Sequence, residues 1–418
     1  MSRPRTHPDY FSVNFDEMPY VVAWEMTRSC ALACRHCRAM AIPRRDPREL
    51  RTEEGKRLID DLVRFGRPIL VLTGGDPFVR RDLPELTAYT VEQGLHVGLS
   101  PSATALVTRQ RLAELMDGLA MLHVSLDGLE GTHDAFRGVA GSFQRTLGIM
   151  RDARSLGLPL QIGSTMTRQT VADLPGLAAL LEQLHVQVWN VFFLVPTGRG
   201  QRQDMLDAVE TEAVLLWLWR LSKRVPFRVR TTAAQHYRRV VIQQERLARD
   251  LPPDQPSNQV HWETTGAGYA FREGSAPQQR GVNDGNGFAF VSHLGDVYPS
   301  GFLQMAVGNV RETSIVELYR EHPLFAALRD PTRLRGKCGR CAYRSVCGGS
   351  RARAWSLTGN PLAPDPSCLY EPGGGVPSCP PLENLLAAPG SAAMAPPDDG
   401  GNPGRTPIRA AFYPDGRP

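Results

Sequence analysis

Three cysteines near the amino end of the chain are the residues whose type and spacing most directly suggest chemistry. Cys30, Cys34 and Cys37 form a C-x3-C-x2-C motif directly after an apolar stretch at residues 20–24. Three thiolates on one short loop can hold three corners of a [4Fe-4S] cluster and leave the fourth iron without a protein ligand. Such an iron can bind a small molecule, so the loop indicates a reaction site as well as an electron carrier.

A structural zinc ion is the alternative for this loop, and His36 could supply the fourth ligand that tetrahedral zinc requires. The residue after Cys37 is Arg38 and not histidine. The C-x-x-C-H motif that attaches c-type haem is therefore absent.

A second group of cysteines lies near the other end of the chain. It comprises Cys338, Cys341, Cys347 and, farther along, Cys368. Four cysteines can enclose a complete metal centre, and a zinc ribbon uses similar short spacings. The first motif favours iron and sulfur here as well. In a reducing cytosol, these cysteines are expected to bind metal and not to form disulfides. The sequence gives no role for Cys379.

Two short polar segments follow predicted strands. In residues 73–77, Gly74 and Gly75 would let the backbone approach a ligand, and Asp76 could accept a hydrogen bond from an ammonium group. Ser125 and Asp127 end another predicted strand and offer a hydroxyl and a carboxylate of the kind that contacts ribose. Ordinary tight turns are the alternative explanation for both segments.

The elements that must position these residues form repeated strand–helix units, which predict an α/β fold with a parallel sheet. A helix follows the first strand, with Thr52 as its cap and Gly66 at its end. Six such units can curl into a partial (β/α)6 TIM-like barrel with its reactive loops at the carboxyl ends of the strands. The predicted strands span residues 21–26, 69–73, 97–100, 121–126, 161–166 and 188–194.

The rest of the chain gives weaker signals. A helical stretch is predicted at residues 215–221, a strand at 227–231 and a hairpin at 288–298, whereas a polar insertion at about 254–286 has no assignment. The end of the chain is rich in Pro, Gly and Ala, which predicts disorder.

Composition narrows the class of protein. The chain has 418 residues and a formal net charge of +5. It has no long run of like charges, no signal peptide and no apolar stretch that could cross a bilayer. These features predict a cytoplasmic protein that binds neither nucleic acid nor membrane.

Taken together, these motifs resemble the radical S-adenosylmethionine superfamily over about residues 21–370. The cluster motif appears as Cys30, Cys34 and Cys37, and the superfamily's GGE motif appears as Gly74, Gly75 and Asp76. Ser102 would take the place of the usual asparagine after the third strand. The resemblance implies that S-adenosylmethionine contacts Gly74, Gly75, Asp76, Pro77, Ser102, Ser125 and Asp127.

Residues 124–138 and 192–200 look like the SPASM and twitch branch, whose C-terminal unit binds auxiliary clusters. Cys338, Cys341, Cys347 and Cys368 match the second auxiliary site of that branch. Ser300 and Arg351 stand where cysteines of the first site would be expected, so the resemblance implies one auxiliary [4Fe-4S] cluster.

The resemblance also divides the chain into five parts. We expect an N-terminal extension (1–20), the barrel (21–225), an unassigned connection (226–286), a SPASM/twitch-like auxiliary cluster domain (287–372) and a disordered tail (373–418).

Within the branch, residues 37–39, 192–200 and 298–302 are most similar to the haem synthase group of the siroheme-dependent pathway and its haem d-type relatives. That likeness implies a tetrapyrrole substrate with propionate arms and an electron donor of the flavodoxin or ferredoxin type. The 5'-deoxyadenosyl radical would abstract hydrogen from the substrate. Arginines bind carboxylates through paired N–H groups, and the candidates are Arg44, Arg45, Arg199, Arg202, Arg351 and Arg353.

Two other functions remain open. Many SPASM enzymes modify ribosomally made peptides, although only the short segment 1–20 precedes the first strand here. A redox or zinc-binding interaction protein without catalysis would keep the cysteines, but it would not need the polar loops at the strand ends.

Overall fold

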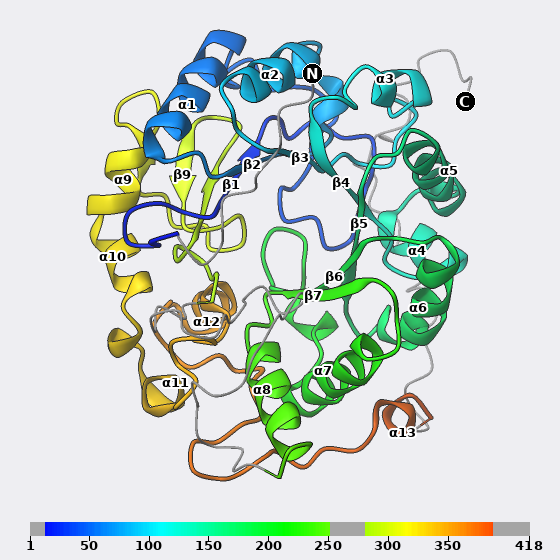
Figure 1. Ribbon diagram of the computed structural model, residues 1–418, viewed down its shortest axis with the longest axis vertical. Coiled ribbons are helices and arrows are strands. Elements are labelled where there is room, and N and C mark those ends of the chain that lie inside the picture. Colours follow the sequence, from blue (N-terminus) through cyan, green and yellow to red (C-terminus); the bar gives the residue numbers. More distant parts are fainter. Residues whose placement is uncertain (1–12, 251–280, 388–418) are drawn as a thin grey trace, which may run out of the picture.

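The computed structural model describes residues 13–250 and 281–387. At its centre lies a ten-stranded sheet in the order β10-β9-β8-β1-β2-β3-β4-β5-β6-β7. Strands β1 to β7 pair in parallel with their neighbours in chain order. Figure 1 shows this curved sheet inside a ring of helices. The predicted fold, an α/β partial barrel, is confirmed.

All six predicted strands form, and their ends differ from the predicted ends by two residues at most. They are β1 (Val21–Glu25), β2 (Ile69–Thr73), β3 (Val97–Leu99), β4 (Leu119–Ser125), β5 (Leu160–Met166) and β6 (Val188–Phe193).

Two further parallel strands flank these six. The strand predicted at 227–231 is β7 (Arg228–Thr232), which pairs with β6. The predicted hairpin is also present and consists of β8 (Phe288–Val291) and the antiparallel β9 (Asp296–Tyr298). Strand β8 pairs in parallel with β1, and β10 (Gly308–Asn309) completes that edge. The hairpin therefore continues the same sheet as the barrel strands.

Helices cover the outer face of the sheet, where the strands bury their apolar side chains. They are α1 (Thr52–Phe65), α2 (Leu83–Glu92), α3 (Arg109–Ala113), α4 (Glu130–Arg137), α5 (Ser142–Ser155), α6 (Leu174–Gln183), α7 (Ala208–Ser222) and α8 (Tyr237–Leu247). Helix α7 contains the helical stretch predicted at 215–221.

The prediction that Thr52 caps α1 is wrong. The N-cap residue is Arg51, whose N–H donates to the Glu54 carboxylate at 2.8 Å. The Thr52 hydroxyl instead donates to the Asp82 carboxylate at 2.8 Å, which links the helix to the loop before α2. Gly66 ends the helix as predicted, with a left-handed φ of 117°.

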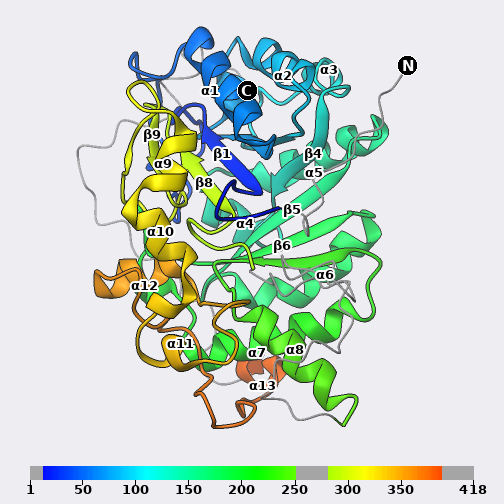
Figure 2. The ribbon, with the colours of Figure 1, turned by 60° about the vertical axis from the view of Figure 1, so that its left-hand side comes forward.

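The C-terminal part adds small helices beside the barrel (Figure 2). They are α9 (Ile315–Glu321), α10 (Pro323–Arg329), α11 (Gly336–Arg340), α12 (Arg351–Thr358) and α13 (Leu382–Ala387). Single 3-10 turns occur at η1 (Pro77–Val79), η2 (Val171–Asp173), η3 (Arg202–Asp204) and η4 (Pro331–Arg333).

Disorder from residue 373 onward was predicted, and this is wrong for residues 382–387. They form α13, which packs against α7 and buries Leu382. The tail from 388, the first twelve residues and most of the polar insertion lie outside the described residues. Among the described helices, none is both long and apolar enough to cross a membrane.

Candidate functional site

The first cysteine motif lies on the loop that leaves the carboxyl end of β1. Two backbone hydrogen bonds close the base of this loop, from Cys30 N to Ile42 O at 3.1 Å and from Ile42 N to Arg28 O at 3.0 Å. Cys30 and Cys34 are buried, and Cys37 is half-buried. The sequence thus places three sulfurs on one short, closed loop, as predicted.

Each of these sulfurs accepts an N–H hydrogen bond. The Leu32 amide donates to Cys30 Sγ at 3.3 Å and the Ala41 amide donates to Cys37 Sγ at 3.4 Å. The third donor is the Arg137 guanidinium, 3.7 Å from Cys34 Sγ. N–H groups aimed at cysteine sulfurs stabilise thiolates bound to iron, so these donors fit cluster ligation.

Without a metal, burial favours the neutral, protonated form of these thiols. It raises the pKa of Cys30 to about 12, and it raises the pKa of Cys34 as well despite the nearby Arg137. These thiols are therefore neutral at physiological pH, and metal binding must displace their protons.

Helix α4 holds the cysteine loop from one side. The Phe136 and Arg137 carbonyls accept hydrogen bonds from Arg35 N at 3.0 Å and Ala33 N at 3.2 Å. The Phe136 ring also stacks on His36, with the ring centroids 4.2 Å apart. His36, the possible zinc ligand, thus packs against an aromatic ring.

The Gly-Gly-Asp segment after β2 contacts the chain that leads into the cysteine loop. Gly75 N donates to Thr27 O at 2.7 Å, and Asp76 N donates to Ser29 O at 2.8 Å. A Cβ on Gly75 would lie only 2.4 Å from Ser29 O, and one on Gly74 would lie 2.4 Å from Thr27 O. In the structure these glycines allow two backbone segments to approach each other, and their predicted contact with a ligand stays a prediction.

Asp76 is fully buried, and both of its carboxylate oxygens have partners in the protein. One accepts from Phe78 N at 3.1 Å and so caps η1, which begins at Pro77, and the other accepts from the Thr104 hydroxyl at 2.6 Å. Burial raises the pKa of Asp76 to about 6, although the Thr104 hydrogen bond opposes this shift. Contact between Asp76 and the methionine ammonium stays a prediction.

Ser102 brings three of the predicted loops together. Its hydroxyl donates to Gly75 O at 2.5 Å and lies 3.2 Å from Cys30 Sγ. The loops after β1, β2 and β3 therefore meet at one point, at the carboxyl ends of their strands.

The loop after β4 joins this site through Asp127. The Asp127 carboxylate is buried, accepts from Thr165 N at 2.8 Å and forms an ion pair with Arg137, the residue that donates to Cys34. Ser125 is half-buried at the end of β4. The ribose contacts proposed for Ser125 and Asp127 stay predictions.

A buried carboxylate at the end of β1 was missed from the sequence. Glu25 pairs with Arg38 at 2.9 Å, with His293 at 3.1 Å and with Arg28 at 3.2 Å. Burial alone would raise the pKa of Glu25, but these cationic and hydrogen-bonding partners lower it to about 2. Arg38 also stacks on Phe290 at 4.6 Å. The only signal in the sequence was an acidic residue inside an apolar strand.

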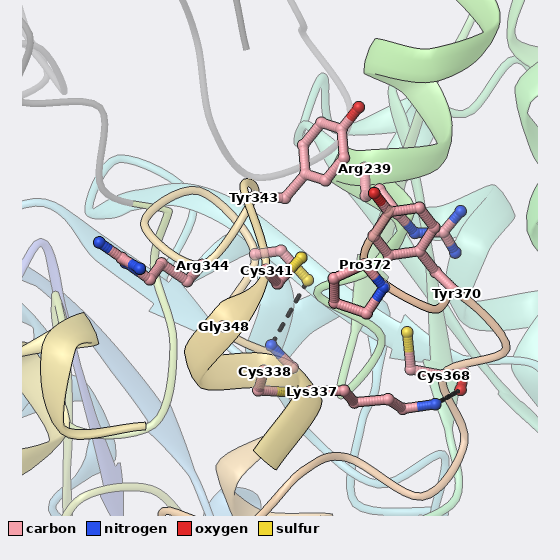
Figure 3. A pocket seen from close by; sticks show the side chains of 12 residues that line it. Arg239, Lys337, Cys338, Cys341, Tyr343, Arg344, Gly348, Cys368, Tyr370 and Pro372 are labelled. Atoms are coloured by element: carbon pink, nitrogen blue, oxygen red, sulfur yellow. Dashed lines mark hydrogen bonds between the residues drawn. The ribbon is translucent and has the colours of Figure 1, made fainter. Parts of the chain in front are cut away.

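The second cysteine group lines one pocket, which has an empty volume of about 370 Å³ that includes its open mouth. Figure 3 shows Cys338, Cys341 and Cys368 around this space. The Gly349 amide donates to Cys347 Sγ at 3.4 Å.

The other three sulfurs of this group also have donors. The backbone amides of Tyr343 and Tyr370 donate to Cys341 and Cys368, respectively. The Arg351 guanidinium lies 3.8 Å from Cys338 Sγ. All four sulfurs therefore have an N–H neighbour, as in the first motif.

Positive charge surrounds this pocket. Arg239 lies beside Cys347 and Cys368. An ion pair between both of its terminal nitrogens and the Glu212 carboxylate holds it in place. Burial raises the pKa of Cys368 to about 12, whereas Arg239 and Lys337 oppose this shift. A space lined by sulfurs and their N–H donors, with cations nearby, fits a negatively charged iron–sulfur cluster. Within the described residues, no three Cys, His, Asp or Glu side chains are grouped to hold a single metal ion.

The candidate arginines have different environments. Arg351 and Arg353 are buried and bind backbone carbonyls, and Arg353 also pairs with Asp365 at 3.1 Å. The backbone carbonyls and Asp365 occupy N–H donors of both guanidinium groups. The expectation that Arg351 and Arg353 bind a substrate is therefore wrong. Arg44, Arg45 and Arg202 are exposed.

Arg199 differs from the other candidates. Its backbone N–H donates to Cys37 O at 3.1 Å, and its Nε and Nη2 atoms are buried without hydrogen-bond partners in the described part of the chain.

The side chain of Ser300, which stands where a cysteine of the first auxiliary site would be expected, accepts from Phe302 N at 3.2 Å and Leu303 N at 3.1 Å. Cys379 is half-buried and does not line the pocket.

Comparison with known proteins places this geometry in context. The profile of the family described as "Radical SAM superfamily" matches residues 24–181. An "AdoMet-dependent heme synthase" of Nitratidesulfovibrio vulgaris is 38% identical over 84% of this chain and 92% of that protein. A "Pre-heme d1 synthase" of Dinoroseobacter shibae is 31% identical, and the match covers 83% of this chain and 85% of that protein.

Peptide-modifying enzymes are also similar to this chain. A "PqqA peptide cyclase" of Rhodopseudomonas palustris is 30% identical over 85% of this chain and 88% of that protein. Among solved structures, Streptococcus suis SuiB bound to S-adenosylmethionine superposes on this chain with a TM-score of 0.63 at 15% identity. The match covers 85% of this chain and 78% of the SuiB chain. At that identity the likeness supports the fold alone.

Proposed function

Because this chain belongs to the radical S-adenosylmethionine superfamily, we propose that it abstracts hydrogen from the propionate arms of an iron tetrapyrrole. The observation that carries the proposal is the 38% identity to an AdoMet-dependent heme synthase, which extends over 84% of this chain and 92% of that protein. The barrel loops and the cysteine donors described above support it.

We infer the cofactor positions from the chain's own residues. Cys30, Cys34 and Cys37 would hold a [4Fe-4S] cluster, while Cys338, Cys341, Cys347 and Cys368 would hold one auxiliary [4Fe-4S] cluster. When bound, the first cluster and S-adenosylmethionine together supply a 5'-deoxyadenosyl radical, and the protein supplies position and exclusion of water. The loops with Gly74, Gly75, Asp76, Pro77, Ser102, Ser125 and Asp127 would hold S-adenosylmethionine beside the three sulfurs.

The proposed reaction converts a propionate arm to a vinyl group. With the cofactors bound, the arm would lose one hydrogen atom to the deoxyadenosyl group. It would then break its bond to the carboxylate carbon, release carbon dioxide and give up one electron. Arg199, whose Nε and Nη2 atoms are buried without hydrogen-bond partners among the described residues, would bind the carboxylate of an arm near the reaction site.

Two electrons must therefore be moved in each turnover. A flavodoxin or ferredoxin would supply the one that cleaves S-adenosylmethionine. The one released by the substrate needs an acceptor close to the barrel, and the cation-lined pocket of the second cysteine group is the natural place for it.

Peptide modification is the second candidate, because a PqqA peptide cyclase is 30% identical to this chain. The similarity to the heme synthase is higher at nearly the same coverage, which favours the tetrapyrrole.

Anaerobic reconstitution followed by turnover tests this proposal. The protein would be loaded with iron and sulfide, reduced, and incubated with S-adenosylmethionine and an iron porphyrin that carries four propionates. We expect 5'-deoxyadenosine together with a porphyrin that has lost carbon dioxide and two hydrogens per modified arm, as measured by mass spectrometry. An unmodified porphyrin, with 5'-deoxyadenosine formed only when a candidate peptide is added, would support the peptide maturase instead.

The variant Cys34→Ala tests the role of the three-sulfur loop. It should abolish formation of 5'-deoxyadenosine while keeping the iron bound by the C-terminal cysteines, because the two groups lie on separate elements. Cys379→Ser is the matched control and should keep full iron content and activity, since Cys379 does not line the pocket. Unchanged cleavage of S-adenosylmethionine in Cys34→Ala would contradict the assignment.

A further inference from the structure

The inner face of the barrel carries an arginine that the candidates above did not include. On β6 and β7, the side chains of Trp189, Val191 and Val229 join the hydrophobic core under the helices. Because side chains alternate along a strand, Asn190 and Arg230 face the interior of the barrel. They are register partners on adjacent strands, so their side chains lie next to each other. Figure 1 shows the outer helices on the opposite side of these strands.

The Arg230 side chain is half-buried, and no residue in the described part of the chain forms an ion pair with it. Its Nε is buried without a hydrogen-bond partner in the described part of the chain. Burial lowers the pKa of Arg230, and the nearby cation Arg228 lowers it further, whereas the Tyr20 phenol opposes the shift.

Three fully buried arginines elsewhere in this fold have partners. Arg80 pairs with Asp82, Arg239 with Glu212 and Arg353 with Asp365. A buried charge without a counterion is costly. Arg230 has no such partner among the described residues, which leaves it free to receive an anion from outside them.

We propose that Arg230, together with Asn190, binds a carboxylate arm of the substrate inside the barrel. The guanidinium offers two parallel N–H donors, the geometry that a carboxylate accepts. The Asn190 carboxamide lies beside it, and its oxygen already accepts from the Thr232 hydroxyl at 3.1 Å, which leaves the amide N–H₂ group to donate.

This inference rests on the proposed function, and it adds a second anchor to that of Arg199. Arg199 lies on the loop after β6 next to Cys37, whereas Arg230 lies on β7. Two cationic anchors on separate elements suit a ligand that carries several carboxylates around its edge. One arm would be held at the reaction site while another is held within the barrel.

Binding of an iron porphyrin to the reconstituted protein tests the subsite. The probes are an iron porphyrin with four propionates and its tetramethyl ester, and the measurement is a titration of the porphyrin absorbance band under anaerobic conditions. We expect Arg230→Gln to weaken binding of the tetrapropionate by about tenfold or more, because a charge-assisted hydrogen bond is lost. Binding of the ester should not change.

The matched control is Arg228→Gln, which removes an exposed arginine from the same strand and should change the dissociation constant less than twofold. If the wild-type protein binds no tetrapropionate porphyrin, the proposed function itself fails. If the wild-type protein binds it and Arg230→Gln binds equally well, only the present inference is overturned. Equal weakening of the acid and the ester would also overturn it, since that result would indicate general damage.

A second readout separates a binding role from a structural one without any ligand. Arg230→Gln should leave the melting temperature of the ligand-free protein unchanged or higher, because it removes a half-buried charge that has no ion-pair partner in the described part of the chain. Arg80→Gln should lower it, since Arg80 donates to the Met26 and Leu50 carbonyls. A fall for Arg230→Gln as large as that for Arg80→Gln would show that Arg230 supports the fold and would contradict the proposal.

Discussion

Arg137 connects the first cysteine motif to the loop after β4. One of its terminal nitrogens lies 3.7 Å from Cys34 Sγ, and the other pairs with the buried Asp127. A fixed positive charge beside a cluster thiolate favours the reduced form of the cluster. Hydrogen bonds to sulfur and nearby charge are among the main factors that set the reduction potential of iron–sulfur clusters.

Replacing this cation should therefore change the potential of the first cluster. In Arg137→Met we expect the midpoint potential to fall by about 60 mV or more, which is a tenfold change for a one-electron couple. Potentiometric titration followed by electron paramagnetic resonance would measure it. Arg137→Lys keeps the charge and should recover part of the loss, and the C-terminal cluster should keep its potential in both variants. An unchanged potential at full iron content would contradict this role.

The residues that could be predicted are those with local patterns. Both cysteine groups and the Gly-Gly-Asp segment stand out because their spacing is short. Glu25, Arg38 and His293 could not be predicted as a unit, because Glu25 and His293 are 268 residues apart and neither has an informative neighbourhood. For the same reason the sequence could not show that Arg351 and Arg353 are used by the fold.

At the level of elements, close contact between backbones places the loops. The segment after β2 lies against residues 27–29, and Gly75 occupies the tightest point of this contact. Cys30 directly follows that segment, so the packing of one loop fixes where the first sulfur lies.

We expect Gly75→Ala to disrupt this contact. The added methyl group would lie 2.4 Å from Ser29 O and 2.6 Å from Arg28 O, so one segment must move. The free energy of unfolding should fall by about 2 kcal/mol or more, and the first cluster should reconstitute poorly.

Chemical denaturation and iron analysis would measure both effects. Gly148→Ala is the matched control because nothing lies within 4 Å of its added carbon and Gly148 is within α5. It should raise stability by about 0.5–1 kcal/mol. Equal stability of the two variants would contradict the expectation.

The six barrel strands were predictable because each one is a short, mostly apolar run between turn signals. Their partners were only partly predictable. The order of the six barrel strands follows from repeated strand–helix units, in which successive strands lie side by side. The parallel pairing of β8 with β1 depends on a contact between distant segments, and no local pattern encodes it.

In the whole molecule, Glu25 joins three parts of the chain that are far apart in sequence. It sits at the end of β1 and pairs with Arg38 from the cysteine loop and with His293 from the turn between β8 and β9. The barrel, the first cysteine motif and the C-terminal hairpin therefore share one buried charge network.

This network predicts a pH-dependent contribution to stability. The pKa of Glu25 is about 2 in the folded protein, below its usual 4.5, so its stabilising effect is fully present above about pH 4.5 and is lost as the pH falls toward 2. Glu25→Gln should lower the unfolding free energy of the metal-free protein by roughly 3 kcal/mol near neutral pH.

The difference between wild type and Glu25→Gln should shrink as the pH is lowered through this range, as measured by thermal unfolding at a series of pH values. Glu114→Gln, which changes an exposed glutamate, is the control and should show no such trend. A difference that is constant down to low pH would contradict the assigned pKa.

The position of β1 between β2 and β8 also has a consequence for biosynthesis. As the nascent chain leaves the ribosome, β2 can cover one side of β1 early, but β8 begins only at Phe288. Until β8 is made, one edge of the hydrophobic strand β1 has unpaired backbone N–H and C=O groups. Such edges can pair with strands of other chains. Slow translation or a shortage of chaperones should therefore cause this protein to accumulate as insoluble aggregates even when its finished form is stable.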